Sequence, residues 1–261
     1  GAAFYRDIDL DTLAKQQVDP RLGVAWRITP RHWLRATSQS SLIDPLRTQD
    51  TLAPVALLGV VVPDVYFTAS DTLPASWYHQ LRWDAEWSRR VYTFVQVDRQ
   101  DVEDFSLGFV PDSRLTLFGF LKDGRLDTVS FGANVWLLEN VGLAASYKHL
   151  WSENRSPDAN RGRALPLISR EEFESSLVWV DRRQITVALT GEYSGARAAN
   201  LAARRDLDGY WTANVVANWQ PLARHLSLTL SIENLLNENY VLAEGFPAAG
   251  TSVLLGAEWR F

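Results

Sequence analysis

The sequence is dominated by segments in which apolar and polar residues alternate at every second position. In residues 210–219 the side chains from Trp211 to Trp219 are apolar at each odd position, and Thr212, Asn214 and Asn218 lie between them. Residues 226–233 and 252–261 repeat the pattern. Because successive side chains of a strand point to opposite faces, the alternation predicts β-strands with one apolar and one polar face.

The connections between these segments alternate between short and long. The short ones are residues 30–31, 88–89, 139–140, 181–183 and 220–224, and the long ones lie near 9–20, 40–76, 99–125, 150–172, 194–209 and 235–251. A soluble sandwich also alternates along its strands, but short turns at one end and long loops at the other are typical of outer-membrane barrels.

We therefore predict an all-β fold, an antiparallel up-and-down transmembrane β-barrel with about twelve strands in this chain. The first strand is expected near Ala2–Asp9, and the strand that ends at Phe261 is expected to close the barrel. Residues 57–67 and 115–121, the latter followed by a turn-like segment 122–124, could each add a hairpin. The chain could also be the C-terminal part of a larger barrel.

Composition narrows the class of protein further. The 11 Trp and 8 Tyr suit a surface at the edge of a bilayer, where aromatic rings gather. The longest apolar run, residues 52–62, contains Pro54 and is shorter than the roughly 20 residues of a membrane helix, so strands would cross the membrane. A net charge of -5 without basic clusters argues against nucleic acid as a partner. The absence of Cys excludes disulfides and thiolate metal sites.

Charged residues fall on the polar face of the predicted strands, where they would line a lumen because charges facing lipid are costly. The candidates are Arg82, Asp84, Glu86, Lys148, Glu192, Glu233, Glu258 and Arg260. Such charges can tune what passes or bond to a plug. The alternatives are that they pair with one another and only stabilise the wall, or that they are the solvated face of a soluble sheet.

No motif for catalysis or metal binding emerges. His32, His79, His149 and His225 lack the spacing of a ligand set, so we expect no metal and no cofactor. Carboxylates alternate in residues 7–11 without the Gly and distal Glu of a calcium loop, and residues 191–195 do not form a nucleophile elbow. We predict a protein that is not an enzyme, with a barrel hydrolase as an open alternative.

The last part of the chain carries several motif spacings at once. Residues 232–240 read IENLLNENY, residues 245–247 read GFP, and residues 255–261 read LGAEWRF. Together they resemble the C-terminal β-barrel region of TonB-dependent outer-membrane receptors, and residues 19–26 and 165–170 resemble strand starts of the same family. The resemblance implies a transport function in the outer membrane, binding or passing a substrate.

The same resemblance raises alternatives, because the family has barrels of about 22 strands preceded by a plug and an energy-coupling segment. The chain shows neither segment, so residues 1–261 are expected to form one barrel domain without a plug. Similar barrels that follow periplasmic helical repeats imply a second possibility, an anchor or export channel. The chain starts Gly1-Ala2-Ala3 and lacks Met, so we expect a processed chain or a fragment.

The final strand resembles the terminal segment recognised by the outer-membrane assembly machinery, which is thereby an expected partner beside membrane lipid. Its apolar residues at every second position are Val253, Leu255, Ala257, Trp259 and Phe261. Burial against lipid alone would require the same alternation.

Overall fold

The computed structural model describes most of the chain. The described residues are 1–10, 13–42, 56, 57, 60, 61, 75–106, 120–200, 202, 205–221, 225–243 and 245–259. Among them, no helix is long and apolar enough to cross a membrane. Arg260 and Phe261 lie outside the described residues.

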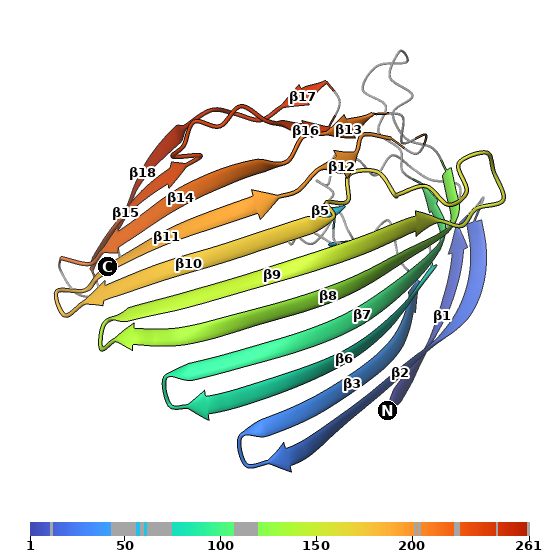
Figure 1. The fold of residues 1–261 in the computed structure, drawn as a ribbon, viewed down its shortest axis with the longest axis horizontal. Helices are drawn as coiled ribbons and strands as arrows, with labels where there is room; N and C mark the ends of the chain where they lie inside the picture. Colours follow the sequence, from blue (N-terminus) through green and yellow to red (C-terminus); the bar gives the residue numbers. More distant parts are fainter. Residues whose placement is uncertain are drawn as a thin grey trace.

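Twelve antiparallel strands form one sheet in the order β1-β2-β3-β6-β7-β8-β9-β10-β11-β14-β15-β18 (Figure 1). They are β1 (Ala2–Leu10), β2 (Leu13–Thr29), β3 (His32–Leu42), β6 (Ala75–Ser88), β7 (Val91–Ser106), β8 (Phe120–Leu138), β9 (Val141–Asn154), β10 (Glu171–Asp181), β11 (Ile185–Ser194), β14 (Tyr210–Trp219), β15 (Leu226–Glu233) and β18 (Ser252–Trp259). The predicted up-and-down topology and strand number are confirmed, since each strand pairs with the next strand of this sheet along the chain.

Three small strand pairs lie outside the main sheet. They are β4 (Ala56–Leu57) with β5 (Val60–Val61), β12 (Arg197–Ala198) with β13 (Asp206–Leu207), and β16 (Val241–Ala243) with β17 (Phe246–Pro247). The described part of segment 57–67 therefore belongs to a separate two-stranded pair and does not widen the sheet. Leu121 and the predicted turn at 122–124 lie inside β8, where Asp123 pairs with Glu103, so that turn prediction was wrong.

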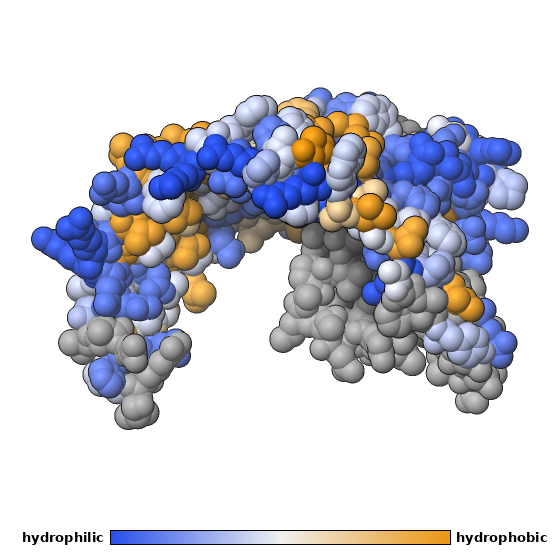
Figure 2. All heavy atoms as spheres, turned by 90° about the horizontal axis from the view of Figure 1, so that it is seen from below, coloured by the Kyte–Doolittle hydropathy of each residue, from blue (hydrophilic) through white to orange (hydrophobic). Residues whose placement is uncertain are grey.

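Among the described residues the two edge strands of the sheet, β1 and β18, do not pair, so the sheet is not closed into a barrel. Figure 1 shows β1 at one edge of the sheet and β18 at the other, and Figure 2 shows that the molecule curves into an open arch. Since neighbouring strands are antiparallel and the sheet has twelve of them, β1 and β18 run in opposite directions. An up-and-down barrel then closes either by pairing these two edges or by inserting an even number of further strands.

Several expected long loops are shorter than predicted because strands continue into them. β2 begins at Leu13, β7 reaches Ser106 and β8 starts at Phe120, so residues 13–20 and parts of 99–125 are strand. β8 has 19 residues and β7 has 16, more than the roughly 9–11 that cross a bilayer. The loop prediction failed there because these extensions are rich in polar residues, at Lys15, Gln16, Gln17 and Asp19 on β2 and on both faces of β7 and β8, which hides the period-2 hydrophobicity used to find strands.

One face of the sheet carries a continuous apolar band. Across the sheet the register places Leu177 opposite Leu189, Leu189 opposite Val215, and Leu230 opposite Leu255. Large apolar side chains of this face are exposed, from Trp179 at 37% to Leu255 at 76%. An apolar face of this extent on an ordinary soluble surface would be exceptional.

The opposite, polar face is the more buried one, as expected of the concave side of a curved sheet, where side chains converge. Asp84, Thr128, Ser130 and Thr212 on this face are all buried. Buried aliphatic side chains gather instead at the end of the sheet with the long connections; they include Val102, Leu121, Leu126, Leu150, Leu165, Ile168 and Leu207. The described part of the molecule is therefore apolar outside and polar inside over the sheet, with a small core under its long connections.

Candidate functional site

The described lumen candidates share one face of the sheet. The register pairs five of them with polar residues: Arg82 with Gln96, Lys148 with Ser130, Glu192 with Thr212, Glu233 with Ser252 and Glu258 with Ser227. Asp84 and Glu86 lie two and four residues after Arg82 on β6, on the same face, opposite Phe94 and Tyr92. We call this face the polar wall. Its role as a lumen lining remains a prediction, and Arg260 lies outside the described residues.

Arg82 and Asp84 form the centre of a network on β3, β6 and β7. Arg82 Nε lies 2.8 Å from Asp84 Oδ1, and Arg35 Nε lies 3.3 Å from Asp84 Oδ2. Tyr92 donates its hydroxyl to Asp84 and accepts from Arg82 Nη2 at 3.1 Å. Asp84 is 4% exposed, so one buried carboxylate lies between two guanidinium groups and offsets one of their two positive charges. Ion pairs and hydrogen bonds hold this part of the wall in a fixed arrangement that keeps a net positive charge.

Arg82 has two further contacts that hold its side chain. Its Nη1 donates to Gln96 Oε1 at 3.1 Å, and its guanidinium lies 4.0 Å from the centre of the Phe94 ring. A planar guanidinium can make a fork of hydrogen bonds and stack on an aromatic face at the same time, which lysine cannot do.

The remaining candidates are not brought together with this network. Lys148 Nζ pairs with Glu172 at 3.2 Å, and Ser252 donates to Glu233 at 3.3 Å. Glu192 lies directly opposite Glu174, an unfavourable like-charge pair across neighbouring strands. Glu86 is exposed at the end with the short turns. The polar wall thus has separate charge groups rather than one site.

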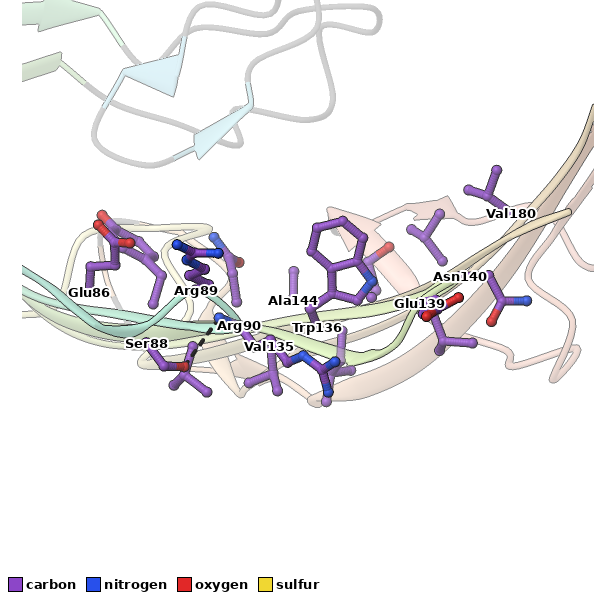
Figure 3. A pocket seen from close by; sticks show the side chains of 18 residues that line it. Glu86, Ser88, Arg89, Arg90, Val135, Trp136, Glu139, Asn140, Ala144 and Val180 are labelled. Carbon is purple, nitrogen blue, oxygen red and sulfur yellow. Dashed lines mark hydrogen bonds between the residues drawn. The ribbon is translucent and has the colours of Figure 1, made fainter. Parts of the chain in front are cut away.

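A hollow of about 790 Å³ lies near the short turns of β6–β7 and β8–β9. Figure 3 shows Glu86 and Trp136 on one side of the sheet and Val135 on the other, and all three line the hollow. Since both faces contribute, it is the space around adjacent turns and not a chamber of the polar wall.

At the opposite end, three connections pack on the sheet and on one another. We call the described parts of residues 155–170, 195–209 and 234–251 the loop layer. Pro166 bridges Ala198, and the Leu167 amide donates to the Ala198 carbonyl at 2.8 Å. Leu165 and Leu121 are fully buried beneath. The first two connections therefore form one packed unit.

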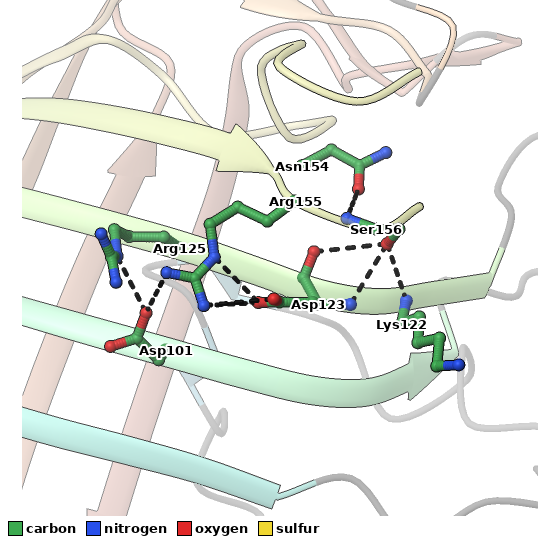
Figure 4. Close-up of polar contacts among 7 residues, drawn as sticks. All are labelled: Asp101, Lys122, Asp123, Arg125, Asn154, Arg155 and Ser156. Carbon is green, nitrogen blue, oxygen red and sulfur yellow. Dashed lines mark hydrogen bonds and ion pairs between the residues drawn. The ribbon is translucent and has the colours of Figure 1, made fainter. Parts of the chain in front are cut away.

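The first connection is fastened to β7 and β8 by charge and by a serine (Figure 4). Arg155 lies 2.8 Å from Asp123 and 3.2 Å from Asp101, and the hydrogen bond to Asp123 raises the pKa of Arg155. The buried Ser156 hydroxyl accepts from the backbone amides of Lys122 and Asp123 at 2.9 and 3.1 Å. These contacts fix residues 154–158 over the end of the wall.

The second and third connections are joined through Arg197. Its Nη2 donates to the carbonyls of Val241 and Leu242 at 2.6 and 3.2 Å. The guanidinium lies 5.2 Å from the ring centre of Tyr210, which stacks on Tyr240 at 3.9 Å. Burial lowers the pKa of Arg197 and raises the pKa of Tyr240. A charged side chain here has only neutral partners.

Asn234 organises the third connection and gives a physical reason for the motif in residues 232–240. It has a φ of 48°, a left-handed conformation that asparagine tolerates better than most residues. Its side chain donates to the carbonyls of Glu238 and Ala249 at 2.9 and 3.1 Å and accepts from the Glu238 amide at 2.9 Å. The motif is thus a turn that ties both ends of the connection together.

The sequence reasoning missed Arg35 and Tyr92 of the wall network and Arg197 of the loop layer. Arg35 and Tyr92 follow the same strand alternation as Arg82 and could have been found by extending it. Arg197 lies in a connection, where no period exists to place a side chain. Among the described residues, no group of three or more His, Asp or Glu side chains could hold a metal ion.

No protein-family profile and no curated protein matches the chain. Solved structures of TonB-dependent receptors do match it. The ferric preacinetobactin receptor BauA from Acinetobacter baumannii aligns with a TM-score of 0.66 and 15% identity over 95% of this chain and 37% of its own. The ferric citrate transporter FecA aligns with a TM-score of 0.66 and 14% identity, over 94% of this chain and 38% of its own.

The FrpB iron transporter from Neisseria meningitidis aligns with a TM-score of 0.63 and 13% identity, over 95% of this chain and 40% of its own. The chain therefore spans well under half the length of these proteins. At such identities the likeness concerns the fold, which is that of part of the barrel of these outer-membrane receptors.

Proposed function

We propose that this chain, with the fold of a TonB-dependent receptor barrel, is a wall segment of an outer-membrane transport barrel that binds or passes a substrate. Residues 1–261 would form one barrel domain whose polar wall lines the lumen. The observation that carries the proposal is the apolar band, which is continuous in register across the sheet and opposed by a polar face.

The order of residues within the band supports placement in a bilayer. On β10 to β18 the centre is aliphatic, with Leu177, Leu189 and Val215 in line. Toward the long connections lies an aromatic row, in which Tyr193 and Phe173 contact Trp211 at 4.8 and 5.9 Å. Toward the short turns lie Trp179, Trp219 and Trp259. Aromatic girdles on both sides of an apolar band are typical of outer-membrane barrels.

The partners follow from the same proposal. Lipid covers the apolar band, and the assembly machinery inserts the barrel. A plug and an energy-coupling partner belong to the receptor type that the fold resembles and would act with the polar wall. The second candidate, an anchor or export channel after periplasmic repeats, would use the same wall without a coupling partner.

A role in transport is favoured over catalysis because the matched proteins are receptors and transporters. Among the described contacts of His32, His79 and His149 there is no serine hydroxyl for a hydrolase base to activate, although His149 Nδ1 lies 3.8 Å from Glu171 Oε1. His32 packs on Trp83 and Trp87, His79 stacks on Trp77, and His149 contacts Tyr147 and Trp151.

The proposal is tested in cells with and without the gene. We expect the protein in the outer-membrane fraction, extracted only by detergent, because its apolar band is unstable in water. Uptake of radiolabelled ferric chelates, the cargo class of the matched proteins, is expected to fall several-fold without it. Recovery in the soluble fraction would overturn the location, and unchanged uptake of every chelate by an outer-membrane protein would favour the anchor or export candidate.

Deleting Phe261 tests the proposed recognition signal. We expect a several-fold loss of folded protein in the outer membrane, measured by the shift in gel mobility on heating. The matched control is Phe261→Tyr, which keeps a terminal aromatic ring and should assemble normally. Normal assembly of the deletion variant would show that the end of the strand serves only as lipid-facing surface.

A further inference from the structure

Arg197 is a basic side chain that is buried in the loop layer without an acidic partner among the described residues. It is 5% exposed, and its pKa is lowered by burial. The groups that act on its charge are Tyr210 and Tyr240, and no carboxylate of the described residues forms an ion pair with it. A buried charge without a counter-charge is costly, since attraction to an opposite charge is what offsets its loss of water.

The hydrogen bonds of the guanidinium are also incomplete. Nη2 donates to two carbonyls, whereas the buried Nη1 has no partner among the described residues. The side-chain oxygen of Asn200, three residues along, is likewise buried without a partner. Unmade hydrogen bonds of buried polar groups cost about 1–3 kcal/mol each, more for charged groups. Residues 195–200 thus contain one buried donor, Arg197 Nη1, and one buried acceptor, Asn200 Oδ1, that make no hydrogen bond within the described residues.

The position of Arg197 indicates from which side a ligand arrives. Its guanidinium lies over Tyr210, which pairs with Ser194 and has the same strand parity as Thr212 and Asn214. Those residues belong to the polar wall, and the apolar band is on the other face. A ligand that reaches Arg197 from the wall is a water-soluble molecule and not a membrane lipid.

The chemistry of the ligand follows from the free end of the guanidinium. Its N–H groups form a planar fork that matches the two oxygens of a carboxylate or phosphate. A neutral carbonyl would satisfy a hydrogen bond but leave the charge unbalanced. An oxyanion satisfies both the hydrogen bond and the charge.

We propose that Arg197 anchors a binding site for a small soluble oxyanion, carboxylate or phosphate, between the second and third connections of the loop layer. The ligand completes the hydrogen bonds of Nη1 and balances the charge. Since Nη1 is buried, the anion enters when residues 195–200 open locally and holds them closed once bound. Only one part of this proposal rests on the proposed function, namely that the anion enters from the lumen of a barrel.

The test uses the purified full chain in detergent micelles, so its result does not depend on uptake in cells. Succinate and pyrophosphate are titrated by calorimetry at constant ionic strength set with chloride. We expect saturable binding of at least one of them and at least tenfold weaker binding by Arg197→Gln. The matched control is Arg161→Gln, which removes the same charge from an exposed side chain of the same layer and should bind like the wild type.

A second measurement needs no variant, which guards against misfolding of Arg197→Gln. Hydrogen exchange of the wild type is expected to slow at residues 197–199 on adding the anion, but not at 158–162. Unchanged exchange, the absence of saturable binding, or equal weakening in both variants would overturn the proposal. Binding of lipid A micelles but of neither soluble anion would overturn the assignment of a soluble ligand.

Discussion

Replacing Leu189 by arginine is expected to destabilise the protein by about 2–4 kcal/mol in a lipid bilayer, the cost of a cation near the membrane midplane. Leu189 lies in the centre of the apolar band between Leu177 and Val215. It is 42% exposed, so in water the same change would remove little burial and would cost much less. The size of the effect therefore reports whether lipid or water covers this face.

The neighbouring residue gives the matched control. Thr190 points to the polar wall, and Thr190→Arg is expected to change stability by less than about 1 kcal/mol, because a lumen accommodates charge. Both variants are compared by denaturant titration of protein folded in vesicles. Equal effects of the two substitutions would contradict the assignment of the faces, and a negligible effect of Leu189→Arg would contradict placement in the bilayer.

Asp84→Ala is expected to be the most destabilising change in the polar wall, at about 3 kcal/mol. Removing one partner of a buried ion pair typically costs about 3–5 kcal/mol, and the lower end applies because Arg35 is half exposed and partly screened. The variant would leave Arg82 with a tyrosine and a glutamine but no counter-charge. Unfolding in denaturant measures the loss.

The control is Asp127→Ala, which removes an equally short ion pair in a more exposed place. Asp127 lies 2.6 Å from Arg99, with the two side chains 35% and 49% exposed. Exposed pairs contribute about 0–1 kcal/mol, so this variant should be nearly as stable as the wild type. If the two variants lost the same amount, the network around Asp84 would be as solvated as the surface, and a rigid wall there would be excluded.

Local pattern was sufficient to predict the sheet. Side chains alternate between two faces at every second residue only in a β-strand. A polar residue on the lipid-facing side would be unfavourable, so residues 210–219 and 226–233 could be assigned to faces without any tertiary information. The same logic failed at residues 13–20, where polar residues occupy both faces, and at residues 122–124, where Lys122 and Asp123 place charges on both faces.

The candidate site was only partly predictable. Arg82 and Asp84 are two apart on one strand, so their shared face followed from the sequence, but Arg35 reaches them because β3 pairs with β6 over a long connection. Whether a charge is balanced depends on such neighbours. Glu192, predicted on the same grounds as Arg82, lies opposite another glutamate instead.

The sequence by itself determined the central part of most strands, which face each of them turns outward, and that the apolar face suits lipid, because these depend on neighbours one or two positions away. Only the tertiary structure decided that β1 and β18 remain unpaired edges among the described residues, that the connections pack into a layer, and that Arg197 is buried with neutral partners. Pairing and burial join residues far apart in the chain, and no local period encodes them.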